Sequence, residues 1–104
     1  MKRKINAVQF GLGPIGQLCA RTIIQKHNDR INLVGAVDIH PAKVGKDLGE
    51  LIGIETTGIT VVEDIRSILR KSRVDVVFHT TTSFMTDVRE QLIELIKLKL
   101  NIVS

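Results

Sequence analysis

The stretch Gly11-Leu12-Gly13-Pro14-Ile15-Gly16 decides the fold of this 104-residue chain. Its three glycines have the spacing G-x-G-x-x-G. They follow the apolar run from Ile5 to Phe10 and open a helical pattern that reaches about Lys26. Proline suits the first position of a helix, because it has no amide hydrogen to leave unpaired there. A glycine-rich turn between a strand and a helix is typical of a phosphate-binding loop.

Each glycine of this loop has a separate task. Gly11 permits the tight turn out of the strand, Gly13 lets the backbone approach a pyrophosphate, and Gly16 lets the helix pack close to the strand. The start of the helix offers free amide hydrogens and a partial positive charge, which suit a diphosphate. The competing interpretation is that the glycines are ordinary turn residues of an α/β protein.

An acidic residue stands where a dinucleotide site needs one. The run Ile31 to Val37 predicts a second strand, and Asp38 closes it about 20 residues beyond Gly16, as the fingerprint requires. Its carboxylate would accept hydrogen bonds from the hydroxyls of the adenosine ribose and would favour NAD over NADP. His40 and Lys43 would offset the repulsion of a 2′-phosphate, so we expect NAD or NADP. Alternatively, Asp38 is a polar strand end and Lys43 a solvated charge.

The remaining chain repeats the alternation of strands and helices. We expect a short helix at Lys46 to Ile52, a strand at Ile59 to Val62, a helix from an Asp64 N-cap to about Lys71, a strand at Val74 to Phe78, a helix from Phe84 or Thr86 to Leu98, and a strand at Asn101 to Val103. Strands separated by helices pair in parallel through right-handed crossovers. The fold class is therefore α/β, a Rossmann-type doubly wound parallel sheet of about five strands in the order 3-2-1-4-5. Helices cover both faces, and residues 1–104 form one NAD(P)-binding domain.

The first helix is expected to bury one apolar face, made of Ile15, Leu18, Cys19, Thr22 and Ile23. A polar loop, His79 to Ser83, follows the fourth strand at the point where the strand order reverses, which is where doubly wound sheets bind ligands. We expect Thr80, Thr81, Thr82 and Ser83 on the nicotinamide side of the cofactor. Thr82 or Ser83 would also cap the next helix. A histidine that closes a buried strand is more often structural than catalytic, so no catalytic residue is assigned.

Composition excludes several classes of protein. Hydrophobic residues make up 43% and charged residues 25%, with a net charge of +4, which are ordinary values for a globular domain. The basic residues are scattered without interleaved aromatic residues, which argues against nucleic-acid binding. No apolar run approaches the roughly 20 residues that span a membrane. The single cysteine, Cys19, excludes an internal disulfide, fits a small buried side chain, and favours a cytoplasmic setting. No metal site is expected.

Three stretches together resemble a known family: VQFGLGPIG (8–16), VGAVDIHPAKVGKDLGELIG (34–53) and DVVFHTTTSF (75–84). They are similar to the N-terminal domain of 2,4-diaminopentanoate dehydrogenases, within the dihydrodipicolinate-reductase-like oxidoreductases. The resemblance implies NAD(P)-dependent oxidative deamination of a small diamino acid, held by a second domain outside this chain. It also implies that the pyrophosphate is held by Gly11, Gly13, Pro14, Ile15 and Gly16. Asp38 would then meet the ribose, and residues 80–83 would lie at the nicotinamide side.

Two other functions compete with a dehydrogenase or reductase. A non-catalytic nucleotide-sensing regulatory module also carries G-x-G-x-x-G between a strand and a helix on a chain of similar length. A protein-interaction domain would leave the loop and Asp38 unexplained. The sequence leaves the oligomeric state open, a homo-oligomer included.

Overall fold

The computed structural model describes residues 4–80, 92–98 and 100–103. Within them lies one five-stranded parallel sheet in the order β3-β2-β1-β4-β5, which confirms the predicted fold class and strand order. The elements are β1 (Ile5–Phe10), α1 (Pro14–Lys26), β2 (Ile31–Val37), α2 (Leu48–Ile52), β3 (Val61–Val62), α3 (Arg66–Leu69), β4 (Val76–His79) and β5 (Ile102–Val103). Residues 92–97 form a further helical segment.

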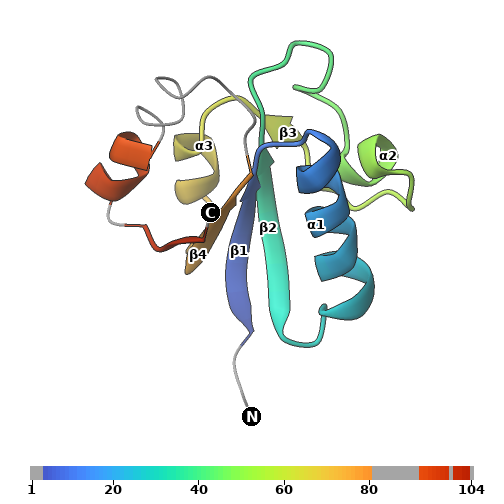
Figure 1. Cartoon of the computed structure of the whole chain (residues 1–104), viewed down its shortest axis with the longest axis horizontal. Coiled ribbons are helices and arrows are strands. Elements are labelled where there is room, and N and C mark those ends of the chain that lie inside the picture. Colours follow the sequence, from blue (N-terminus) through green and yellow to red (C-terminus); the bar gives the residue numbers. More distant parts are fainter. Residues whose placement is uncertain (1–3, 81–91, 99, 104) are drawn as a thin grey trace.

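Helices cover both faces of the sheet (Figure 1). On one face, α1 and α2 pack over a core that includes Ala7, Leu33 and Ile52. On the other face, α3 and the helical segment 92–97 enclose a second core around Val8 and Val77. Because side chains alternate along a strand, β1 supplies Ala7 to one core and Val8 to the other. The central strands are therefore buried on both sides, as expected of a parallel sheet.

The bounds of α1 match the prediction, whereas its buried face matches only in part. The helix begins after Gly13, has proline in its first turn, and buries Gly16, Ala20 and Ile23. Ile15 and Leu18 were expected in the core, yet 64% and 58% of their surfaces are exposed. The smallest side chains face the sheet, so the helix axis lies closer to the strands and the larger residues turn outward. Cys19 was expected to be a small buried side chain, and it is half-buried and packs against the core.

The middle of the chain departs most from the expected bounds. Helix α2 begins at Leu48 and not at Lys46 as predicted, because Asp47 is its N-cap. The Asp47 side chain accepts hydrogen bonds from the amides of Gly49 and Glu50. The third strand was predicted to begin at Ile59. It contains only Val61–Val62, and Thr60 instead forms an isolated antiparallel bridge with Asp47. Residues 54–60 thus return from the end of α2 to the residue that caps its start, before the chain enters the sheet at Val61.

The bounds of the later elements differ from the predicted ones by one or two residues. Asp64 does accept a 2.9 Å hydrogen bond from the Arg66 amide, but it does so as a turn residue, and Ile65 is the N-cap of a helix that ends at Leu69. The fourth strand begins at Val76 and includes His79, which the sequence placed in the following loop. Most of the helix predicted from Phe84 or Thr86 lies outside the described residues.

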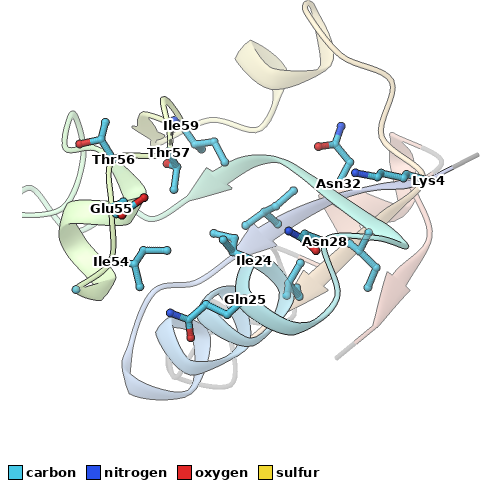
Figure 2. Close-up of a pocket in the computed structure, with 14 residues that line it drawn as sticks. Lys4, Ile24, Gln25, Asn28, Asn32, Ile54, Glu55, Thr56, Thr57 and Ile59 are labelled. Carbon is cyan, nitrogen blue, oxygen red and sulfur yellow. Dashed lines mark hydrogen bonds between the residues drawn. The ribbon is translucent and has the colours of Figure 1, made fainter.

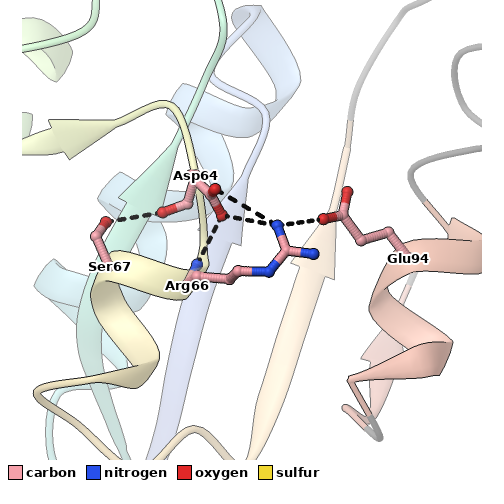
Figure 3. A network of polar contacts seen from close by, with 4 residues as sticks. All are labelled: Asp64, Arg66, Ser67 and Glu94. Carbon is pink, nitrogen blue, oxygen red and sulfur yellow. Dashed lines mark hydrogen bonds and ion pairs between the residues drawn. The ribbon is translucent and has the colours of Figure 1, made fainter.

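An ion pair joins the two helical elements of the second face (Figure 3). Arg66 on α3 lies 2.6 Å from Glu94 and 3.4 Å from Asp64. All three side chains are about half exposed, so this contact orients the elements more than it stabilises them. No helix among the described residues is long and apolar enough to cross a membrane.

Candidate functional site

The glycine loop lies at the carboxyl end of β1, between the two strands that flank it. Gly11 leaves the strand with φ of 105°, a left-handed conformation that favours glycine. Its amide donates to the carbonyl of Val37 on β2 at 2.8 Å, and the Thr80 amide, just after β4, donates to Phe10 at 2.9 Å. The loop therefore opens at the point where the strand order reverses, the position of ligand sites in such sheets.

Both backbone polar groups of Leu12 are held by side chains. Asp38 accepts a 2.8 Å hydrogen bond from the Leu12 amide. The Leu12 carbonyl accepts from Lys43 Nζ at 2.8 Å and from Gln17 Nε2 at 2.9 Å. The Leu12 side chain is fully buried. These contacts fix the turn between Gly11 and Gly13 before any ligand arrives.

Gly13 and Gly16 differ in the space around them. A Cβ atom added to Gly13 would meet nothing within 4 Å, so an open cradle lies in front of the loop. A Cβ atom at Gly16 would overlap the Gly11 carbonyl and come within 2.8 Å of Thr80 Oγ1. Within the described chain, no side chain caps the start of α1 and no acidic residue lies in its first turn. The amides of this first turn are therefore not capped by a side chain or paired with an acidic residue of the turn.

The structure brings the predicted residues Gly11, Gly13, Gly16, Asp38 and Lys43 together around one loop. Asp38 is already engaged, since its second oxygen accepts from the His40 amide at 2.8 Å. Each carboxylate oxygen retains a second lone pair for a ribose hydroxyl. Lys43 contacts the loop itself, a role the sequence did not suggest. Pro14 and Ile15 lie in the first turn of α1 and are exposed.

The nicotinamide-side residues are described only in part. Thr80 packs against the glycine loop, where its hydroxyl donates to the Gly11 carbonyl at 3.2 Å. Thr81, Thr82 and Ser83 lie outside the described residues, so their predicted role stays a prediction. His79 is buried, with 3% of its surface exposed, and its ring stacks on Phe10 at 5.3 Å. This placement supports a structural role for His79.

Sequence reasoning missed two glutamines of this site. Gln17 holds the Leu12 carbonyl from the first turns of α1. Gln9 lies fully buried in the middle of the sheet, and its amide reaches the Gly11 carbonyl at 3.1 Å and Thr80 Oγ1 at 2.8 Å. The available signal was a polar residue in an otherwise apolar central strand, two positions before the loop.

A hollow of about 400 Å³ opens beside Asp38 at the same edge of the sheet. Its walls come from the ends of β1, β2 and β3, from the start of α3 and from the segment 92–97: Phe10, Ile39, Glu63, Asp64, Ile65, Arg66, Glu94 and Leu95. Ile39, directly after Asp38, is 66% exposed and offers a flat apolar side chain. Such a mixture of apolar wall and polar rim suits a small planar ring.

A larger hollow lies elsewhere (Figure 2). It measures about 620 Å³ and is bordered by the second half of α1, the start of β2 and residues 53–59, with Asn28 and Asn32 on its rim. None of the glycine-loop residues lines it. The size of a hollow therefore does not by itself identify the candidate site.

The described residues give no sign of metal or thiol chemistry at this edge. Among them, no three His, Cys, Asp or Glu side chains gather as metal ligands. Burial raises the pKa of the Cys19 thiol, which favours the unreactive protonated form.

Fold and site together define a doubly wound α/β domain with a dinucleotide-type phosphate loop at its switch point. The chain belongs to the family "dihydrodipicolinate reductase, N-terminus", whose model matches residues 6–103. It is 35% identical over 62 residues to a 4-hydroxy-tetrahydrodipicolinate reductase of Synechocystis, covering 60% of this chain and 22% of that protein. It is 32% identical over 77 residues to the enzyme of the same name from Methanocaldococcus jannaschii, covering 72% and 28%.

A solved structure has the same fold. An amine dehydrogenase from Mycobacterium smegmatis superposes with a TM-score of 0.82 and 31% identity over 96% of this chain, which is 29% of that enzyme. The chain thus spans less than a third of the length of each of these relatives.

Proposed function

We propose that this chain is the NAD(P)-binding domain of an oxidoreductase. The single observation that carries this proposal is the cradle at Gly13, open in front of a loop whose Leu12 backbone is fixed on both sides. A pyrophosphate fits this cradle, because the helix start offers free amides and a partial positive charge. The names of the relatives, reductases and an amine dehydrogenase, agree with this chemistry.

The adenosine half of the cofactor would lie over Asp38 and Ile39. Asp38 would accept the ribose hydroxyls with the lone pairs that Leu12 and His40 leave unused. The adenine ring would enter the hollow of about 400 Å³ beside Ile39. The nicotinamide half would extend toward Thr80 and residues 81–83, on the other side of the switch point.

Either NAD or NADP would be accepted. The carboxylate of Asp38 favours the free ribose of NAD. Lys43 lies on the same loop, and its ammonium shares the Leu12 carbonyl with Gln17. Lys43 can therefore turn toward a 2′-phosphate while Gln17 keeps the carbonyl bonded.

The bound cofactor would accept or donate a hydride, while this domain holds and orients it. We further propose a small amino-acid substrate, as in the 2,4-diaminopentanoate dehydrogenases that the sequence resembles, held by a second domain. Similarity to an amine dehydrogenase over nearly the whole chain supports a substrate with an amino group. Similarity to the 4-hydroxy-tetrahydrodipicolinate reductases supports a dihydrodipicolinate-type substrate as the alternative.

Calorimetric titration with NAD, NADH, NADP and NADPH tests the proposal. We expect saturable binding of one dinucleotide per chain, with adenosine diphosphate competing because it carries the pyrophosphate and the adenosine. Guanosine diphosphate is the matched control, since it presents the same diphosphate with a different base. Failure of all four dinucleotides to bind would contradict the proposed function.

A further inference from the structure

A fully buried glutamine lies in the centre of the sheet, directly under the glycine loop. Gln9 pairs with Ala36 on β2 and with Phe78 on β4, so it is covered on both sides by strands. Among the described residues, its Oε1 atom has no hydrogen-bond partner. An unpaired buried carbonyl costs stability, and an apolar side chain of the same shape would avoid that cost. Gln9 is therefore not explained by packing.

The other end of the same amide is fully engaged. Gln9 Nε2 donates to Thr80 Oγ1 at 2.8 Å and to the Gly11 carbonyl at 3.1 Å. The Thr80 hydroxyl in turn donates to that carbonyl at 3.2 Å. The three groups form a closed triangle that joins the end of β1, the glycine loop and the end of β4.

The first turn of α1 rests on this triangle. A Cβ atom at Gly16 would overlap the Gly11 carbonyl and lie 2.8 Å from Thr80 Oγ1, so these two oxygens limit how close the helix can come. A shift of either oxygen would move the start of α1 and its amides. The triangle thus determines the position of the first-turn amides of α1 relative to the open space in front of Gly13.

We propose that Gln9 is a positioning residue for dinucleotide binding, which acts through Thr80 and the Gly11 carbonyl to fix the phosphate loop. This inference rests on the proposed function. Gln9 does not touch the cofactor itself. The pyrophosphate is common to NAD and NADP. Removal of the Gln9 amide should therefore weaken the binding of both cofactors equally and leave the ratio of their affinities unchanged.

The test uses the 104-residue chain and four variants. Gln9→Met removes the amide and keeps the length, Thr80→Val removes the hydroxyl and keeps the shape, and Thr80→Ser retains the hydroxyl. The double variant Gln9→Met/Thr80→Val completes a cycle. We expect either removal to weaken NADH and NADPH about five- to tenfold, the double variant to lose no more than one of the single variants, and Thr80→Ser to bind like the parent.

Melting temperature separates positioning from general stability. Gln9→Met should melt at or above the parent temperature, because it also removes the unpaired Oε1 atom. Val8→Ala, one residue earlier on the opposite face of β1, should melt lower while keeping the parental affinity. If Gln9→Met does not fold, the pair Thr80→Val and Thr80→Ser decides by the same criterion.

Parental affinity in both Gln9→Met and Thr80→Val, or losses that multiply in the double variant, would overturn this inference while leaving the proposed function intact. A parent that binds no dinucleotide would overturn both.

Discussion

Gly13 and Gly16 occupy the same motif for opposite physical reasons. Gly16 is required by the protein's own atoms, since any side chain would overlap the Gly11 carbonyl. Gly13 has φ of −72°, which any residue adopts, and nothing lies near its missing side chain. The fold alone therefore does not require glycine at position 13. The proposed pyrophosphate, lying in that open space, would require it.

Gly13→Val should abolish dinucleotide binding and leave the fold intact. The added side chain would fill the cradle where the pyrophosphate belongs, and its Cβ atom would meet no other atom within 4 Å. Titration with NADH and thermal melting of the variant and the parent check both halves of the prediction. Unchanged affinity would remove Gly13 from the site.

Gly16→Ala is the matched contrast, because it adds a smaller side chain to the same loop. It should lower the melting temperature, since the Gly11 carbonyl or the start of α1 must move. Should Gly13→Val melt as low as Gly16→Ala, its loss of binding would follow from unfolding and say nothing about the cradle.

Asp38 has two partners in the protein and a third expected in the ligand. It holds the Leu12 and His40 amides at 2.8 Å each. Its removal would therefore loosen the glycine loop as well as delete the ribose contact. Only the second effect distinguishes NAD from NADP, so the ratio of the two affinities isolates it.

Asp38→Ala should weaken NAD more than NADP. NAD loses a charge-assisted hydrogen bond worth about 1.5–3 kcal/mol, whereas NADP also loses the repulsion between the carboxylate and its 2′-phosphate. The ratio of NAD affinity to NADP affinity should fall by about tenfold or more, because 1.4 kcal/mol is one decade. Both dissociation constants are measured at low and moderate salt. A ratio that stays constant would make Asp38 a strand-ending residue with a structural role only.

At the scale of elements, the sequence predicted α1 and the two strands around it to the residue. Strong apolar runs and the glycine–proline boundary carry local signals that need no tertiary information. The buried face of α1 was wrong because periodicity ranks Ile15 and Leu18 above Gly16 and Ala20. Close packing against the strand reverses that order. The segment from Asp47 to Val61 was poorly predicted because a single carboxylate organises it over ten residues.

The stability of the α2 segment should depend on the ionised form of Asp47. Its carboxylate accepts hydrogen bonds from four backbone amides, those of Gly49, Glu50, Thr57 and Gly58. These bonds, foremost that of Thr57, hold the pKa of Asp47 below its usual value. A depressed folded-state pKa gives stability that is present above the unfolded pKa and lost as the pH falls through the folded one.

Asp47→Asn should therefore melt below the parent at pH 7, with the difference shrinking as the pH falls below about 4. The amide keeps one acceptor oxygen but cannot serve all four donors. Thermal melts of both proteins between pH 7 and pH 2.5 check this. Asp29→Asn, at the exposed turn before β2, is the control and should track the parent throughout. A difference that stays constant with pH would show that charge on Asp47 is not the cause.

At the scale of the whole molecule, the sheet order followed from the alternation of elements and the handedness of crossovers. The site followed less completely. The glycine loop and Asp38 could be placed because one motif fixes both. Gln9, Gln17 and the loop contact of Lys43 could not, because each depends on which chain segments meet across the sheet. The periodicity of residues along one strand carries no information about such contacts between distant segments.

The 104-residue chain should bind a dinucleotide and turn nothing over. Its match covers only 22–29% of the relatives compared above, and hydride transfer needs a substrate fixed against the nicotinamide. His79, the last residue of β4, is buried and its ring stacks on Phe10, so it is not assigned as a catalytic residue. We expect calorimetric binding of NADH but no change in reduced-nicotinamide absorbance with NAD and 2,4-diaminopentanoate. Gly13→Val, which should not bind, serves as the baseline for both signals. Steady turnover by the chain alone, absent in Gly13→Val, would show that the catalytic groups lie within these 104 residues, residues 81–91 included.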